Sequence, residues 1–410
     1  MSVFDDLVGQ GAVVGQLEAA AADARAVVER HEPRHGAVTR VAGAGAMTHA
    51  WLFTGPPGSG RSIAARAFAA SLQCSTPLPT GAGCGHCADC HQVLVGTHPD
   101  VAQVVPEGLS LLIGEAREII ARSSRAPTRG RWQVTLIEDA DRMEERTSNT
   151  VLKAVEEPPP HSVLLLCAPS AADLLATIRS RCRLAALRTP PTADVARVLV
   201  ERDGVDPAIA SFAARAAQGH VGRARRLATD ETARIERQHV LSLPRSLGSV
   251  ASALQAARDL VDSAKEEAER LTAPRDAAEK GSLETALGVG ATGKGVTGRG
   301  LAGSRGNAGA LKELEKRQRS RGTRTSRDAL DRALVDLAAF YRDVLVVQLG
   351  TGTDLVHADL GEQAATIARR TDPGATLRRV DAVLACRVAL EANVAPLLAV
   401  EAMALALRSA

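Results

Sequence analysis

A glycine-rich turn between a short apolar strand and a helix constrains the fold of this chain more than any other feature. The feature spans residues 49–62, and its glycines are Gly55, Gly58 and Gly60. Glycines at this spacing let backbone N–H groups curl around phosphate oxygens, and the helix that follows adds the positive end of its dipole. The stretch therefore predicts a phosphate-binding loop.

The loop departs from the usual pattern at one position. The pattern G-x-x-x-x-G-K-[ST] puts Gly55 and Gly60 at its glycines and Ser62 at its hydroxyl, but Arg61 stands where the pattern has lysine. Arginine keeps the positive charge and replaces a compact ammonium by a planar fork. We therefore expect these residues, with Gly58, to bind ATP and Mg²⁺ weakly.

A second apolar run ends in two carboxylates. Residues 132–137 are rich in strand-forming side chains, and Glu138 and Asp139 follow directly. In nucleoside triphosphatases such a pair holds Mg²⁺ and polarises the attacking water, usually in the order Asp then Glu. The reversed order here predicts a degraded acidic pair, and a solvated strand end is the alternative.

Further apolar runs alternate with helical patterns through residue 188. Alternation of this kind predicts an α/β fold with a parallel sheet flanked by helices and a pocket at the carboxyl ends of the strands. The 410 residues leave room for two or three domains. The formal charge of +3 is too small to indicate a partner. Without a membrane-spanning run or a signal-peptide pattern, a cytoplasmic protein is the expectation.

Four of the seven cysteines lie within 17 residues of one another, at Cys74, Cys84, Cys87 and Cys90. Thiolates at C-x-x-C spacing chelate one metal ion from a tight turn, and a closed set of four is typical of structural zinc. A redox C-x-x-C pair or chance clustering is the alternative. We expect a Zn²⁺ site that holds the local fold, with the intervening His86 as a bystander.

The first 235 residues resemble the clamp-loader subunits of bacterial DNA polymerase III, within the AAA+ ATPase class. The residues that carry the resemblance are 8–10, 49–50, the four clustered cysteines, 152–158 and the Ser-Arg-Cys run at 180–182. The resemblance implies an AAA+ domain over residues 1–188 with an inserted zinc module at 74–90. It further implies a small helical lid at 189–236 and an all-α collar domain at 237–410. A glycine-rich insertion at 286–309 should be disordered, because it has too few large apolar groups to order itself.

The same resemblance assigns roles to two arginines. Arg181 looks like an arginine finger, which reaches the γ-phosphate bound by a neighbouring subunit; an ordinary exposed arginine at a helix end is the alternative. Arg223 stands where the family has a second phosphate-sensing arginine, although Arg225 and Arg226 lie close to it.

Three departures in one pocket favour the non-motor, delta-prime type of subunit. They are Arg61, the Glu138-Asp139 order and an apolar strand end at 167–168, where motor subunits have a polar sensor. Such a chain would act with motor subunits and a delta subunit in a hetero-pentamer. That assembly loads the sliding clamp onto primed DNA as part of the DNA polymerase holoenzyme, and the chain's own ATPase activity would be weak or absent.

Two rival interpretations remain open at this point. The chain could be an active AAA+ ATPase motor subunit of the gamma/tau type, or a non-enzymatic zinc and scaffold protein with a vestigial pocket. The basic stretch at residues 316–327 favours equally a solvated helix face and contact with the DNA backbone.

Overall fold

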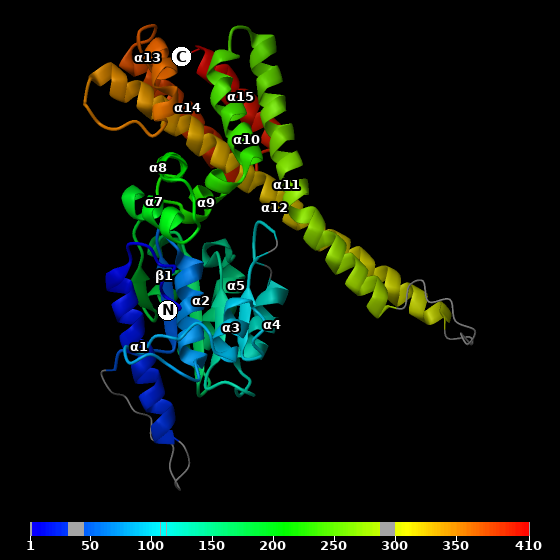
Figure 1. Ribbon diagram of the computed structural model, residues 1–410. Helices are drawn as coiled ribbons and strands as arrows, with labels where there is room; N and C mark the ends of the chain where they lie inside the picture. The colour runs from blue at the N-terminus through cyan, green and yellow to red at the C-terminus, as the bar shows by residue number, and fades with distance from the viewer. Residues whose placement is uncertain (1, 32–44, 107, 112, 288–299, 410) are drawn as a thin grey trace. The chain divides into compact units, whose positions relative to one another are not determined.

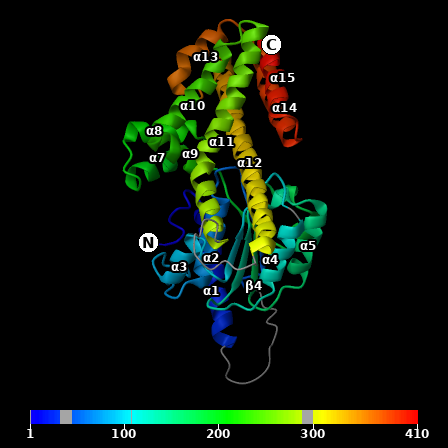
Figure 2. The same ribbon diagram turned by 90° about the vertical axis from the view of Figure 1, so that its right-hand side faces the viewer.

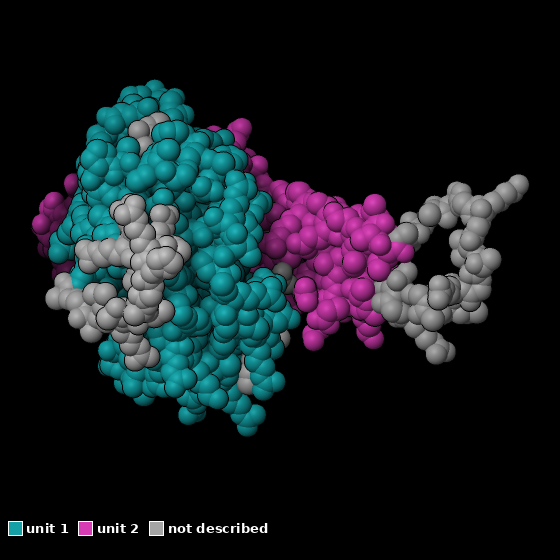
Figure 3. Space-filling view, turned by 90° about the horizontal axis from the view of Figure 1, so that it is seen from below, with its two compact units in different colours: residues 1–106, 110–229 teal, residues 107–109, 230–410 magenta. Residues whose placement is uncertain are grey.

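The computed structural model describes residues 2–31, 45–106, 108–111, 113–287 and 300–409. The chain divides into two compact units, which Figure 3 shows in different colours. The first unit comprises residues 1–106 and 110–229, and the second comprises residues 107–109 and 230–410.

A five-stranded parallel sheet forms the centre of the first unit, as the alternation of strands and helices predicts. Its strands are β1 (Ala50–Thr54), β2 (Val101–Val104), β3 (Gln133–Ile137), β4 (Ser162–Ala168) and β5 (Arg183–Ala186). Their order across the sheet is β2-β3-β4-β1-β5, and each adjacent pair is parallel. The carboxyl ends of β1, β3 and β4 therefore meet at one edge, which is where a parallel sheet places its ligands.

Helices cover both faces of this sheet, as Figures 1 and 2 show. The helices of this part of the chain are α1 (Gly11–His31), α2 (Arg61–Gln73), α3 (Ala88–Leu94), α4 (Ile113–Ser123), α5 (Glu145–Glu156) and α6 (Ala176–Arg179), with short 3-10 turns at Ala140–Arg142 and Ala171–Asp173. Figure 2 shows α1 and α2 on one side of the strands and α4 and α5 on the other.

Alternate side chains of the inner strands build two separate cores. In β1, Trp51 and Phe53 pack with Phe68 of α2 on one face, and the rings of Trp51 and Phe68 meet edge-on at 5.0 Å. Leu52, between them, packs against α5 and α6 on the opposite face. Successive side chains of a strand point to opposite faces of the sheet, and both faces are buried here. The inner strands are therefore continuous apolar runs in the sequence.

Three short helices complete the first unit, and we call them the lid helices because they lie within residues 189–236, where a lid is predicted. They are α7 (Thr192–Glu201), α8 (Pro207–Ala216) and α9 (Val221–Thr229). The unit ends at Thr229, so α10 (Glu231–Ser242) belongs to the second unit, although the expected lid extends to residue 236.

The second unit is all-helical in its described residues. A 3-10 turn at Leu243–Arg245 leads into two long helices, α11 (Val250–Ala286) and α12 (Gly300–Leu349), which lie side by side in Figures 1 and 2. After a 3-10 turn at Ala358–Leu360 come α13 (Gly361–Ala368), α14 (Pro373–Glu391) and α15 (Pro396–Ser409). The core gathers aliphatic residues of these helices around Phe340 and Tyr341 of α12.

The expected disordered insertion at 286–309 is only partly tested. Residues 288–299 lie outside the described residues, as do residues 32–44 of the loop expected before β1. The backbone is helical from Gly300 onward, and disorder of the insertion stays a prediction. Once the helix through residues 310–349 exists, each added residue gains a backbone hydrogen bond without a new nucleation cost.

Candidate functional site

The phosphate loop lies between β1 and α2, as its sequence predicts. Gly58 and Gly60 have φ angles of 84° and 92°, in the left-handed region that favours glycine. Gly60 occupies the N-cap position of α2 and supplies no side-chain cap. The first turn of α2 therefore has no capping side chain from its N-cap residue, which is the arrangement that suits an anionic ligand.

His220 packs directly on the tip of this loop. A Cβ atom added to Gly58 would lie 2.4 Å from Cγ of His220, so only glycine fits there. The imidazole is fixed at the start of α9, where Nδ1 accepts a hydrogen bond from the Arg223 amide at 3.2 Å. His220 therefore joins the lid helices to the phosphate loop. The spacing pattern that identified the loop could not have found it, because the contact is tertiary.

Gln10 also holds the loop in place. Its side-chain amide donates to the carbonyls of Ser59 at 3.3 Å and Arg188 at 2.6 Å, and its side-chain oxygen accepts from the Arg188 amide. The side chain is buried, so these bonds lie largely out of water. The 8–10 segment thus fixes the loop to the chain that follows β5.

Arg61 turns back onto its own loop. Its guanidinium Nη1 donates to the Gly55 carbonyl at 2.6 Å. In the standard loop the corresponding lysine reaches toward the β- and γ-phosphates. Part of the hydrogen-bonding capacity of Arg61 is instead used within the protein.

Glu138 connects the end of β3 to α2 and β2. One carboxylate oxygen accepts from the Ser62 hydroxyl at 2.9 Å, and the other accepts from the Gln103 side-chain amide at 2.5 Å. Ser62 lies in the first turn of α2, Gln103 lies in β2 and Glu138 directly follows β3. A hydroxyl and a carboxylate at this separation can both face one divalent cation. Their hydrogen bond holds the two groups together without an ion.

Two more carboxylates follow Glu138. Asp139 adopts a left-handed backbone conformation with φ of 48° and lies 3.8 Å from the Arg142 guanidinium. Asp141 is the deeper group, and burial and the Asp139 charge raise the pKa of its carboxyl. Its Oδ1 has no hydrogen-bond partner among the described residues. Asp141 was not among the predicted site residues.

The strand end that should carry a polar sensor is apolar. Cys167 and Ala168 end β4 and are both buried, and Cys167 pairs in register with Phe53 of β1. Burial, and secondarily the Glu138 charge, raise the pKa of the Cys167 thiol well above its ordinary value. The next residue, Pro169, accepts a hydrogen bond from the Gly55 amide at 3.1 Å.

Arg181 lies apart from these loop contacts. Its guanidinium forms an ion pair with Glu156 of α5 at 2.9 Å and donates to the Thr177 carbonyl at 3.0 Å. The side chain is 44% exposed. Arg183, two residues on, instead covers the Trp51 ring at 5.3 Å, so the two arginines of this run have different environments.

In the lid, Arg223 lies in the first turn of α9, and Arg225 pairs with Asp203 at 2.7 Å. Arg225 therefore has a structural partner within the lid, and the role of Arg223 as a phosphate sensor stays a prediction.

The four clustered cysteines converge on one point. Their sulfur atoms all lie within 4.8 Å of one another, and Cys74 and Cys87 are 3.9 Å apart. A tetrahedral zinc ion with Zn–S bonds of about 2.3 Å needs sulfur atoms about 3.8 Å apart. The four thiols therefore fit a structural metal such as zinc.

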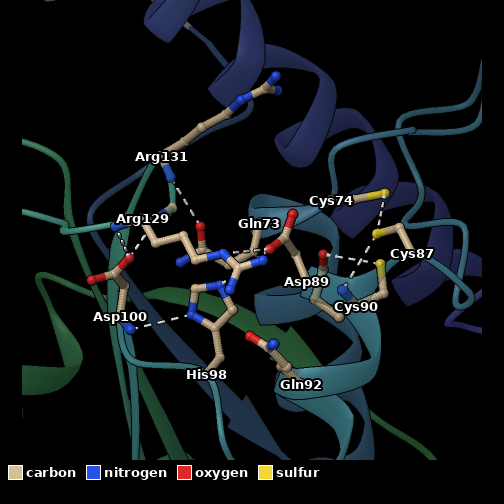
Figure 4. Close-up of polar contacts among 12 residues, drawn as sticks. Gln73, Cys74, Cys87, Asp89, Cys90, Gln92, His98, Asp100, Arg129 and Arg131 are labelled. Carbon is tan, nitrogen blue, oxygen red and sulfur yellow. Dashed lines mark hydrogen bonds and ion pairs between the residues drawn. The ribbon is translucent and has the colours of Figure 1, made fainter.

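Backbone amides donate hydrogen bonds to these sulfurs, and Figure 4 shows the one from Cys90 to Cys87. The Cys84 amide donates to Cys74 at 3.3 Å, and the Cys90 amide donates to Cys87 at 3.4 Å. Burial opposes ionisation of Cys87, but the Cys90 amide and the hydroxyl and amide of Ser75 lower its pKa to about 5. Burial raises the pKa of the Cys90 thiol. A bound cation would stabilise all four as thiolates.

A polar network anchors the cysteine module to the sheet (Figure 4). Asp89, between two of the cysteines, lies 3.7 Å from Arg129 and 3.9 Å from the buried His98. Asp100 accepts four hydrogen bonds from residues 128–130 through its two carboxylate oxygens. Burial opposes its ionisation, but the Gly130 and Thr128 amides outweigh burial and lower its pKa to about 2.

The described helices include none that combines the length and apolarity needed to cross a lipid bilayer.

Comparison with known proteins gives a consistent result for the first unit. Residues 35–191 match the family described as DNA polymerase III, delta subunit. The chain is 35% identical over 146 residues to DNA polymerase III subunit delta' of Pseudomonas aeruginosa, covering 35% of this chain and 44% of that protein. It is 33% identical over 138 residues to DNA polymerase III subunit tau of Escherichia coli, covering 34% of this chain and 21% of that protein. The chain thus spans less than half of either relative.

A solved RuvB structure from Thermotoga maritima aligns with 58% of this chain and 65% of that one, with a TM-score of 0.36 and 16% identity. The fold assignment rests on the sheet topology and not on this alignment.

Proposed function

Residues 35–191 belong to the delta/delta′-type clamp-loader subunits of DNA polymerase III, which are AAA+ related, and from this premise we propose that the chain is a delta′ subunit. The observation that carries this choice is the Arg61 hydrogen bond to the Gly55 carbonyl within the phosphate loop. The buried Cys167 and Ala168 at the end of β4 support it, because neither offers a polar group to a γ-phosphate. The chain's own ATPase activity is then weak or absent.

The proposed role of the chain is to complete the active site of a neighbouring motor subunit. Arg181 is the proposed finger, because it is charged and partly exposed and its pairing with Glu156 at 2.9 Å can be exchanged for phosphate oxygens. The proposed partners are motor subunits and a delta subunit in a hetero-pentamer, with the sliding clamp and primed DNA reached through the assembly. ATP-dependent loading of the clamp during replication is the resulting activity.

A reconstituted loader tests this proposal. The Arg181→Ala variant should assemble normally but lower DNA-stimulated ATPase and clamp loading, because one motor site loses charge stabilisation in its transition state. Arg179→Ala, at the end of the short helix α6 that precedes Arg181, is the matched control and should leave both activities intact. Unchanged ATPase in Arg181→Ala would reject the finger assignment.

One observation favours a motor subunit of the gamma/tau type as the second candidate. Ser62 and Glu138 lie 2.9 Å apart, so the pocket retains a hydroxyl and a carboxylate that can face Mg²⁺. ATP turnover by the purified chain alone, abolished by Asp139→Asn, would establish this candidate instead. Absence of turnover together with weak ATP binding supports the delta′ assignment, and absence of any binding at millimolar ATP supports a vestigial pocket.

The proposed cofactor is one structural Zn²⁺ held by Cys74, Cys84, Cys87 and Cys90. The sulfur spacing and the amide hydrogen bonds support it, and a set of four thiolates has no open position for catalysis.

A further inference from the structure

A cavity in the second unit collects four arginines from four separate segments. It has a volume of about 700 Å³, and its arginines are Arg245, Arg370, Arg379 and Arg408. Arg245 comes from the 3-10 turn before α11, Arg379 from α14 and Arg408 from α15, while Arg370 follows α13. Figure 1 shows α13, α14 and α15 gathered at the end of the unit where the chain ends.

These four arginines lack the carboxylate partners that other arginines of this unit have. Arg332 pairs with Glu267 at 2.7 Å, and Arg387 pairs with Asp331 at 2.7 Å. In contrast, none of the four cavity arginines forms an ion pair with a described residue. Arg245 donates to the neutral side chain of Gln363, and Arg379 donates to the Leu407 carbonyl.

The charge of the lining is correspondingly positive. Glu362 is the one acid among the described lining residues, so four arginines against one glutamate leave a formal charge of +3. Leu247, Ile367 and the buried Tyr341 supply apolar wall. Concentrating like charges in a concave site costs free energy unless an anion offsets it.

We propose that this cavity binds a phosphate-bearing small molecule through Arg245, Arg370, Arg379 and Arg408. Guanidinium groups donate two parallel hydrogen bonds to phosphate oxygens, and several around one cavity favour a polyphosphate over a monovalent anion. The volume lies in the range of small-molecule sites. The site is separate from the phosphate loop, since all its lining residues belong to the second unit.

The composition of the chain provides a specific probe of this cavity. Tyr341 is the single tyrosine among the 410 residues, and it lines the cavity. Full-length protein labelled with 3-fluorotyrosine will therefore give one ¹⁹F resonance that reports on this site. Inorganic pyrophosphate should shift that resonance saturably, whereas sodium chloride at matched ionic strength should not.

Variants then test the named residues. The Arg370→Gln/Arg408→Gln double variant should weaken pyrophosphate binding about tenfold or more, because it removes two charge-assisted contacts. Both side chains are exposed, so the fold should tolerate the change. Arg378→Gln, which lies on α14 beside Arg379 but outside the lining, is the matched control. Ser62→Ala, in the phosphate loop, should leave the shift unchanged.

Parallel titrations distinguish the sources of phosphate. A larger shift with ATP than with pyrophosphate at equal concentration would assign a nucleotide, and equal shifts would assign the phosphate groups alone. Two results would overturn the proposal. One is the absence of a saturable shift with either ligand at millimolar concentration. The other is a shift caused by a glutamate-rich peptide alone, which would make the cavity a protein contact.

Discussion

The guanidinium of Arg61 donates to the Gly55 carbonyl at 2.6 Å, and this bond joins the lysine position of the phosphate loop to the first glycine of the loop. The backbone of the loop therefore follows its expected path, while the cationic side chain of Arg61 is hydrogen-bonded within the protein. A lysine at this position would present one compact ammonium instead of a fork.

Substitution of Arg61 by lysine should restore nucleotide affinity. We expect Arg61→Lys to bind a fluorescent ATP analogue roughly tenfold more tightly, because the ammonium can leave the Gly55 carbonyl and reach the phosphates. Titration of the purified chain measures the effect. Arg66→Lys, on the same helix, is the control, and equal affinities in wild type and Arg61→Lys would show that Arg61 does not limit binding.

Loss of one thiol should release the metal. Cys87→Ser should lower the zinc content from one ion per chain to well below one, because three thiolates no longer close the tetrahedron. The thermal midpoint of the first unit should fall by roughly 10 °C. Elemental analysis and a thermal scan provide the two readouts.

The half-buried Cys182 lies outside the cluster, so Cys182→Ser is the matched thiol control and should keep its zinc. Wild-type protein purified under reducing conditions without bound metal would contradict the zinc assignment.

Asp100 should make the stability of the first unit pH-dependent. Its pKa is lowered from 3.8 to about 2, so its contribution is fully present above about pH 4 and is lost as the pH falls toward 2. Asp100→Asn should therefore destabilise the unit at pH 7 by about 2 kcal/mol, with a smaller difference at pH 3.

Urea unfolding followed by tryptophan fluorescence isolates this effect. Both tryptophans, Trp51 and Trp132, lie in the first unit. A difference between wild type and Asp100→Asn that stays constant from pH 7 to pH 3 would disprove the ionic origin of the effect.

The pairing of α11 with α12 should depend on one arginine. Arg321 is 8% exposed and its Nη1 reaches Asp276 at 2.5 Å and Glu279 at 3.0 Å, both on α11. Arg321→Ala leaves Asp276 without this cation and Glu279 with Arg275 alone, which should cost about 2 kcal/mol because these groups are only partly buried. Hydrogen exchange should accelerate around residues 275–283 and 314–325, while the exposed control Arg319→Ala should leave it unchanged.

The local elements of the site could be predicted from the sequence, whereas its long-range contacts could not. The strand, loop and α2 follow from the spacing of Gly55, Gly60 and the apolar residues around them, and the cysteine cluster follows from C-x-x-C spacing. Gln103 meets Glu138 from 35 residues away, and His220 reaches Gly58 from the lid. Such pairs depend on strand order and helix docking, which no local pattern contains.

The start of α12 shows a different limit. The composition of residues 300–309 argues against order, yet their backbone is helical because they continue a long helix. The arginine cavity shows a third limit. Its four arginines lie in four segments between residues 245 and 408, and nothing in their sequence neighbourhoods predicts that they meet.

The sheet order also determines when the first unit can fold during synthesis. β1 lies between β4 and β5, so the Gly55 amide forms its hydrogen bond with Pro169, which follows β4. Gln10 is hydrogen-bonded to Arg188, which follows β5. A ribosome must therefore extrude the chain past Arg188 before these hydrogen bonds can form, and past His220 before the tip of the loop is covered. Until then the early strands are unpaired and can aggregate. Long-range parallel pairing of this kind is also slow. The cysteine module at residues 74–90 needs no such wait, so it can form an early folded segment within the nascent chain.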